Sequence, residues 1–170
     1  MAGKSIPSSV LLGLLLTTTC GPLAHAASAI GASTARREIE ATLKQRNAAH
    51  DRKDVDGYMQ TFTPSYASVD VMGHSVSYAK LRQAMVDNFA RGNVSNVSWR
   101  ISNVSVHGST AKVELMTIYN YPAIKSPHPA HAYQKAVTDQ IWTKGSGGWQ
   151  ERSEEESLRE IIYSKKPVAL

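Results

Sequence analysis

Apolar residues at helical spacing dominate the first half of the chain. Thr34 can cap a helix over residues 35–50, in which Ile39 and Leu43 are four residues apart on one face. The same face continues to Arg46, and arginine is almost never buried without a partner. Two interpretations stay open: the guanidinium of Arg46 reaches water past the edge of the core, or it enters a pocket.

Two shorter helices are expected between residues 54 and 91. Asp54 or Asp56 can cap the first, which stops at Pro64 and contains the apolar residues Tyr58, Met59 and Phe62. Ser77 can cap the second, which runs over residues 78–91 and has a stripe at a spacing of four, Leu81, Met85 and Phe89. These stripes favour core or pocket wall over a cofactor-binding motif.

Alternation of apolar and polar residues predicts the strands. Residues 66–71 form a short strand with Ala67, Val69 and Val71 on one face, and Gly73 ends it. Longer strands are expected over residues 99–107, 111–121 and 133–143, and from Trp149 onward. This order predicts an α+β fold, in which three N-terminal helices pack on one face of a curved, mostly antiparallel sheet.

The N-terminus has the features of a secretory signal peptide. Lys4 supplies a positive charge, residues 10–16 are apolar, and Ala24-His25-Ala26 has the form of a cleavage site. We expect a signal peptide over 1–26, a flexible leader over 27–34, one domain over 35–163 and a C-terminal tail over 164–170. A lipoprotein acylated at Cys20 is the alternative, although the three threonines before it lack the usual pattern.

Composition limits the partners. The net charge is +5, and because its basic residues are scattered, no nucleic-acid partner is expected. Cleavage after Ala26 removes Cys20, the single cysteine, so the exported chain, periplasmic or secreted, has no thiol chemistry and no membrane attachment. The close histidine pair His128 and His131 is interrupted by a proline, so no metal is expected, and no motif indicates a cofactor.

Two carboxylates lie among apolar neighbours. Asp70 stands between Val69 and Val71 near the Gly73 turn, and Asp139 shares a strand face with Val137 and Ile141. Apolar surroundings raise the pKa of a carboxyl group towards values useful for proton transfer. Alternation, however, puts Asp70 on the face opposite Val69 and Val71, so only one of these two sets can face inward.

A run of three glutamates lies where the last strand is expected. Alternation sends Glu155 to the face opposite Glu154 and Glu156, so that at least one carboxylate points towards the helix-covered side of the sheet. The alternative is a solvated strand end or a bulge.

The sequence resembles the nuclear transport factor 2-like superfamily, especially its SnoaL-like members. The resemblance covers residues 35–163 and rests on DVDGYMQTF (54–62), VDVMG (69–73), TDQIW (138–142) and GGW (147–149). It implies a cone-shaped α+β roll around a pocket that is open at one end. It also makes a homodimer an open alternative.

Ketosteroid isomerases are the nearest well-understood enzymes in this resemblance. Asp70 matches their general-base aspartate and Asp139 their protonated aspartic acid, whereas Arg46 stands in place of their catalytic tyrosine. A cation beside Asp139 would lower the pKa of that acid, so Arg46 favours an anionic ligand, or an ion pair with Asp139 or with an acidic residue of the last strand.

Three hypotheses follow, and the sequence leaves open whether the protein is an enzyme. In the first, the cone binds a small, partly apolar ligand, oriented by Arg46 or Asp139, against a wall of Tyr58, Phe62, Tyr66, Met85, Phe89 and Trp142. In the second, a cofactor-independent isomerase, dehydratase or cyclase uses Asp70 as general base. In the third, the sheet is a structural or dimerisation surface.

Overall fold

The computed structural model describes residues 22–91, 96–121 and 131–164. The start of the signal peptide with Cys20, the stretch that contains His128, and residues 165–170 of the tail lie outside the described residues. Cleavage after Ala26 and export therefore stay predictions.

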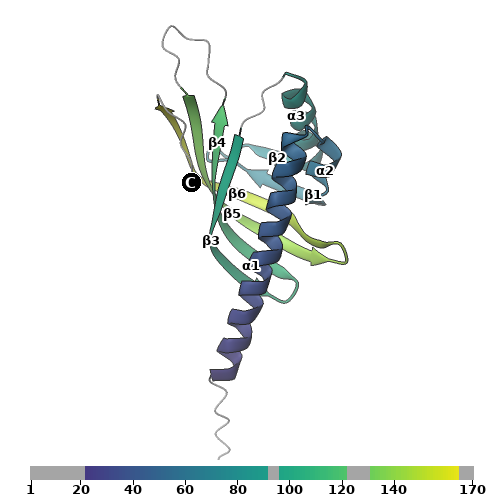
Figure 1. Ribbon diagram of the computed structural model, residues 1–170, viewed down its shortest axis with the longest axis vertical. Coiled ribbons are helices and arrows are strands. Elements are labelled where there is room, and N and C mark those ends of the chain that lie inside the picture. Colours follow the sequence, from purple (N-terminus) through teal and green to yellow (C-terminus); the bar gives the residue numbers. More distant parts are fainter. Residues whose placement is uncertain (1–21, 92–95, 122–130, 165–170) are drawn as a thin grey trace, which may run out of the picture.

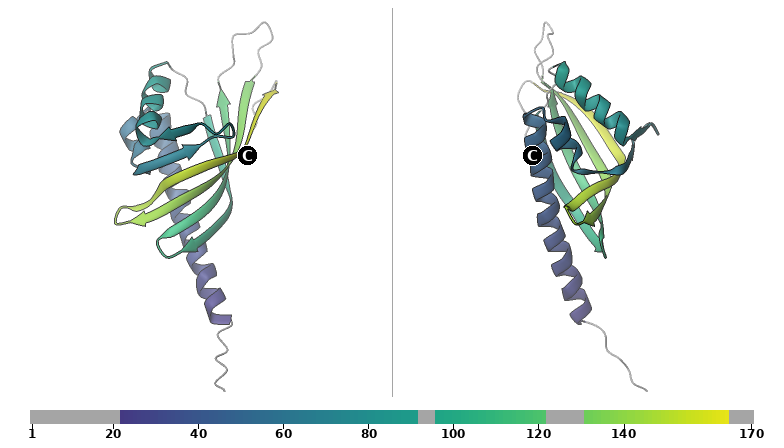
Figure 2. Two further views of the ribbon diagram at one scale, coloured as in Figure 1. Left: turned by 180° about the vertical axis from the view of Figure 1, so that it is seen from behind. Right: turned by 90° about the vertical axis from the view of Figure 1, so that its right-hand side faces the viewer.

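Three helices form the N-terminal half. Helix α1 (Pro22–Asp51) carries Ile39 and Leu43 on its buried face, and α3 (Tyr78–Ala90) is capped by the Ser77 hydroxyl, both as expected. Helix α1 also includes residues 27–34, for which a flexible leader was expected. Ala27, Ala29 and Ala32 explain the difference, since alanine has the highest helix propensity. The first turns of α1 project past the end of the sheet (Figures 1 and 2).

The short second helix ends earlier than predicted. Helix α2 (Val55–Met59) is capped by Asp54, whose side chain accepts from the backbone N–H of Gly57. Phe62, which was assigned to this helix, and Pro64, at which the helix was expected to stop, belong to strand β1 (Phe62–Val69). The proline is tolerated there because the register between β1 and its neighbour shifts between Phe62 and Ala67.

The sheet has six strands in the order β2-β1-β6-β5-β4-β3 (Figure 1). The others are β2 (Ser75–Ser77), β3 (Asn96–His107), β4 (Thr110–Tyr121), β5 (His131–Gly145) and β6 (Gly148–Ser164). Within residues 22–91, 96–121 and 131–164, only β1 and β6 pair in parallel. The predicted α+β class is therefore confirmed, with β2 as an edge strand that the pattern did not indicate.

The main core lies between α1 and the sheet. Ile39 and Leu43 pack there with Val113, Leu115 and Trp142, and all five side chains are buried. Figure 2 shows the sheet curving away from α1 towards α3, so that the helices cover its concave side. This curvature leaves room beyond the core for a cavity.

Strand β6 changes the face that it buries at Arg152, the first of two extra residues in its pairing with β5. Glu151 pairs with Trp142 and Ser153 with Ile141, so Arg152 has no residue opposite it and forms a β-bulge. Before the bulge the buried side chains are Trp149 and Glu151, at odd positions. After it the inward side chains are Glu154 and Glu156, at even positions. The bulge thus places Glu151 and Glu154 on the same side of the sheet.

Strand β1 buries the face opposite its valines. Tyr66 is buried and Ser68 half-buried, whereas Ala67, Val69 and Val71 are exposed. Alternation left open which face of this strand is buried. The face that carries Tyr66, Ser68 and Asp70 points inward.

Candidate functional site

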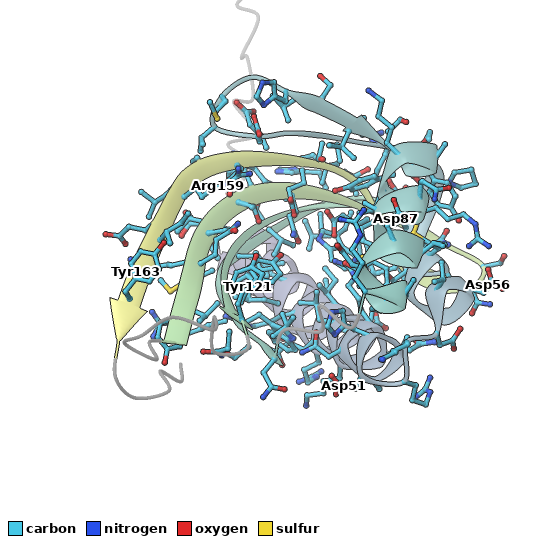
Figure 3. The ribbon with its side chains drawn as sticks, turned by 90° about the horizontal axis from the view of Figure 1, so that it is seen from above. Asp51, Asp56, Asp87, Tyr121, Arg159 and Tyr163 are labelled. Carbon is cyan, nitrogen blue, oxygen red and sulfur yellow. The ribbon has the colours of Figure 1, made fainter. Side chains whose placement is uncertain are left out.

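A cavity of about 830 Å³ lies between the helices and the curved sheet. Figure 3 looks down on it, with Tyr121 inside the curve of the strands and Tyr163 near the end of β6. The apolar wall includes Leu43, Tyr58, Phe62, Tyr66, Met85 and Trp99. The polar side chains that line it include Arg46, Asn47, His50, Thr117, Gln140 and Glu154. The exposed end is lined by Tyr121, Ile161 and Tyr163.

Arg46 forms a buried ion pair at the inner end of this cavity. Its Nη1 lies 2.7 Å from Oε2 of Glu151, whose side chain is 0% exposed, and its Nε donates to the hydroxyl of Thr61 at 2.9 Å. Thr61 in turn donates to the carbonyl of Tyr58. The guanidinium also stacks on Phe62, 4.0 Å from the ring centre. Of the two interpretations of Arg46, the buried one is confirmed, with an acidic residue of the last strand as partner.

Two polar atoms of this ion pair have no hydrogen-bond partner among the described residues. They are Nη2 of Arg46 and Oε1 of Glu151. A buried polar group without a partner costs about 1–3 kcal/mol, and more if charged. The inner end of the cavity therefore has unused hydrogen-bonding capacity.

Glu154 is the second carboxylate of the cavity. Its Oε2 accepts from Nε2 of Gln140 at 2.8 Å, and Oε1 of Gln140 accepts from the indole of Trp142 at 2.9 Å. This chain of hydrogen bonds fixes the amide of Gln140 with its N–H directed at Glu154. Glu154 is half-buried, so a molecule in the cavity can reach it.

Burial disfavours the charged forms of both carboxylates. It raises the pKa of Glu151 to about 8, with Arg46 opposing the shift and Glu154 adding to it. Burial also raises the pKa of Glu154, against the Gln140 hydrogen bond and the charge of Arg46. For Arg46, burial is the largest single effect and acts to lower the pKa, but the charge and hydrogen bond of Glu151, together with Tyr58 and Tyr66, outweigh it and the pKa is raised. The guanidinium stays charged, while the two carboxyl groups compete for a proton.

Three tyrosines beside these groups remain neutral. Burial raises the pKa of Tyr58 to about 12, and it also raises the pKa of Tyr66 and of Tyr119 well above the usual value. The carboxylates Glu151 and Glu154 contribute to the shift at Tyr58 and Tyr66. Their hydroxyl groups can therefore donate hydrogen bonds in the cavity but cannot act as phenolate bases near neutral pH.

His50 lines the cavity from the end of α1. Its ring meets Phe89 edge-on at 5.4 Å between centroids, and burial lowers its pKa, against the charge of neighbouring Asp51. The imidazole is thus held neutral.

The predicted aromatic wall is largely present. Tyr58, Phe62, Tyr66 and Met85 line the cavity. Phe89 instead packs against His50, and Trp142 lies in the core with Arg46 stacked over it at 5.2 Å. These two were predicted as wall residues and instead support the residues that form the wall.

Asp139 does not lie in the cavity. It lies on the half-buried face of β5, and its neighbour Gln140 lies on the other face. Its register partners are the exposed residues Glu114 and Glu155, and its Oδ1 lies 3.5 Å from the ammonium of Lys112. Its side chain is 44% exposed. Arg46, Asp70 and Asp139 therefore do not converge on one cavity, and alternation along β5 sends Gln140 inward in place of Asp139.

Asp70 holds the turn between β1 and β2. Its Oδ1 accepts from the backbone N–H groups of Met72 and His74, at 2.9 and 2.8 Å, and its Oδ2 lies 3.2 Å from the His74 ring. These hydrogen bonds, led by that of His74, lower its pKa. It lines a smaller cavity of about 210 Å³ beside the main one, where Arg159 approaches it at 3.7 Å.

Replacing Asp70 by alanine is expected to destabilise the protein by about 1–2 kcal/mol, because the turn loses its side-chain acceptor. Urea unfolding measures the change. Asp70→Asn retains one acceptor oxygen, so it should recover part of the loss. Equal stability of D70A and the wild type would contradict this role.

The sequence analysis missed Glu151, Thr61 and Gln140 and left Glu154 undecided. For Glu151 the signal lay in the alternation of Trp149, Glu151 and Ser153, since a glutamate shares the face of a buried tryptophan. The β-bulge at Arg152 then places Glu154 on the buried face, and no feature of the sequence predicts that bulge.

No protein-family model and no curated protein matches the chain. Solved structures do. An NTF2-like protein with a cystatin-like fold from Novosphingobium aromaticivorans has a TM-score of 0.60 at 13% identity, over 81% of this chain and 90% of that one. An NTF-2 like protein of unknown function from Shewanella oneidensis MR-1 has a TM-score of 0.57 at 16% identity, over 71% and 97%. The chain has the nuclear transport factor 2-like fold.

This NTF2-like fold confirms the resemblance found in the sequence. A superfamily protein from Salmonella enterica agrees, with a TM-score of 0.56 at 17% identity over 74% of this chain and 91% of that one. Identities this low show the fold and leave the activity to be argued from the site.

Within the described residues, the NTF2-like domain has no group of three or more histidine, cysteine, aspartate or glutamate side chains placed to hold a metal ion. None of the helices in those residues is long and apolar enough to cross a membrane.

Proposed function

We propose that the protein binds a small, partly apolar ligand in its main cavity. The observation that carries the proposal is a cavity of about 830 Å³ with an aromatic wall and a buried polar network at its inner end. Ligand pockets commonly enclose about 300–1,000 Å³ and combine apolar walls with a few placed polar groups. Export to the periplasm or medium is part of this proposal and rests on the N-terminal sequence.

The isomerase, dehydratase or cyclase alternative finds less support. It requires Asp70 to take a proton from a molecule in the cavity. Asp70 lies in the smaller cavity, its oxygens are engaged by the turn, and its lowered pKa makes it a weaker base. The outer side of the sheet, on which the homodimer alternative depends, carries the charged residues Lys112, Glu114 and Asp139 beside the partly exposed apolar residues Val137 and Leu158.

Ligand binding can be tested with N-phenyl-1-naphthylamine, an uncharged probe that fluoresces in apolar surroundings. The mature protein is expected to bind it saturably. Ser68→Phe puts a ring into the cavity from β1, so the affinity should fall about tenfold or more. Ala67→Phe places the same ring on the exposed face of the same strand and should leave binding unchanged.

Urea unfolding of both variants shows whether each is folded. If S68F does not fold, Ala84→Phe on α3 obstructs the cavity from the other side. Absence of saturable binding, or binding that neither obstruction weakens in a folded protein, would overturn the proposed function.

A further inference from the structure

The charges at the inner end of the cavity do not balance. Arg46 contributes one positive charge, and the carboxyl groups of Glu151 and Glu154 contribute two negative charges when both are ionised. The ion pair at 2.7 Å already uses Arg46 for Glu151. Among the described residues, Glu154 accepts a hydrogen bond from the uncharged amide of Gln140 and meets the carboxyl group of Glu151, so no second cation is paired with it. A buried excess charge is costly unless a proton or a cation neutralises it.

The excess negative charge is accessible from the cavity. Glu154 lines both the main cavity and the smaller one beside it, and it follows Glu151 along β6 towards the exposed end. Glu151 is fully buried behind it, with Oε1 unpartnered among the described residues. A ligand that enters past Tyr121 and Tyr163 therefore meets Glu154 before the ion pair.

Aromatic faces surround the same position. Tyr66 precedes Ser68, the register partner of Glu154, on β1, and Tyr58 and Tyr119 also line the cavity. Aromatic faces attract an organic cation, and the attraction grows when water is excluded. Carboxylate and rings together suit an ammonium group attached to an apolar body.

We propose that the ligand of the main cavity carries an ammonium group that pairs with Glu154, while its apolar part packs on Tyr58, Phe62 and Tyr66. This inference rests on the proposed function and names its ligand class. An anionic ligand at the free Nη2 of Arg46 is disfavoured, because the negative charge that Glu151 and Glu154 hold between them already cancels the charge of Arg46. A ligand carbonyl can still accept from Nη2.

Binding of the ammonium group should displace a proton. Without ligand, the two carboxyl groups share one near neutral pH, since burial raises the pKa of both. The charged and titratable groups around Glu154 come from α1, α2, β1 and the turn after it, β4 and β6. They are Arg46, Tyr58, Tyr66, Asp70, Tyr119, Glu151, Glu156 and Arg159. The tyrosines stay neutral and Arg46 stays charged, so the released proton comes from the glutamates.

Three probes with one skeleton test the inference: 3-phenylpropylamine, 3-phenylpropanol and 3-phenylpropionate, each competing with N-phenyl-1-naphthylamine near pH 7. The amine is expected to bind about tenfold or more tightly than the alcohol, and the acid most weakly. Glu154→Gln should remove this preference, so that the amine binds no more tightly than the alcohol. Glu155→Gln, one residue away on the exposed face, is the matched control and should keep it.

Calorimetry in two buffers of different ionisation enthalpy counts the protons. The wild type should release protons when it binds the amine and E154Q should release none. Equal or tighter binding of the alcohol or the acid, an amine preference that survives in E154Q, or no proton release from the wild type would overturn the inference. If the alcohol or the acid binds best and S68F weakens it, the proposed function stands and only the ligand class is wrong.

Discussion

Arg46→Met is expected to destabilise the protein by about 3–5 kcal/mol, the usual cost of removing one partner of a buried ion pair. The change leaves Glu151 fully buried with no cation beside it, and Thr61 loses the Nε donor. The side chain of methionine is similar in length, so the stacking on Phe62 is partly kept. The free energy of unfolding in urea, measured near pH 7, tests this expectation.

A double variant separates charge from packing. Arg46→Met with Glu151→Leu removes both ions, so most of the lost stability should return, since an apolar pair of similar volume often replaces a buried ion pair without loss. Arg37→Met, on the exposed side of α1, is the matched control and should change stability by less than about 0.5 kcal/mol. A single variant as stable as the wild type would show that the ion pair does not form.

Raising the pH from about 6.5 to 8 is expected to lower the free energy of unfolding by up to about 1.4 kcal/mol per pH unit. Burial raises the pKa of Glu151 from 4.5 to about 8. A folded chain with such a carboxyl binds more protons than the unfolded chain in this interval. Unfolding therefore becomes easier as the pH rises, and the loss levels off above the folded pKa.

This interval avoids the opposite contribution of His50. Its folded pKa is lowered, so its contribution to stability is lost as the pH falls below about 6.5 and is constant above it. Urea midpoints between pH 6.5 and 9 should fall in the wild type and in Glu155→Gln. In Glu151→Gln, which cannot ionise, they should stay level. A level profile in the wild type would mean that both carboxylates are ionised throughout.

The sequence predicted the framework of the fold because that framework depends on periodicity. Ile39 and Leu43, and likewise Met85 and Phe89, recur at helical spacing, and the long strands alternate over ten or more residues. Phe62 was misassigned because the helix-like spacing from Tyr58 continues across the end of α2, and only pairing with β6 decides its state.

The site was harder to predict because it depends on which face of each strand is buried. Asp139 and Gln140 are adjacent, and Asp139 was predicted as a site residue because it is a carboxylate among apolar neighbours. The structure has Asp139 facing outward and Gln140 facing inward. Arg46 could be singled out from its helix alone, but its partner is 105 residues away on β6. Only the sheet register brings Glu151 to it.

The extra residue at Arg152 is an insertion that the sheet accommodates without losing its pairing. It lets Glu151 and Glu154, three residues apart in the sequence, lie on the same side of the sheet, opposite Trp142 and Gln140 of β5. Deleting Arg152 would place Glu154 two residues after Glu151, so regular alternation would keep both carboxylates inward and the register with β5 unchanged. Proteins of this fold whose β6 is one residue shorter at this place would therefore present the same side chains to the enclosed space, and a difference in length here does not mark a change of ligand.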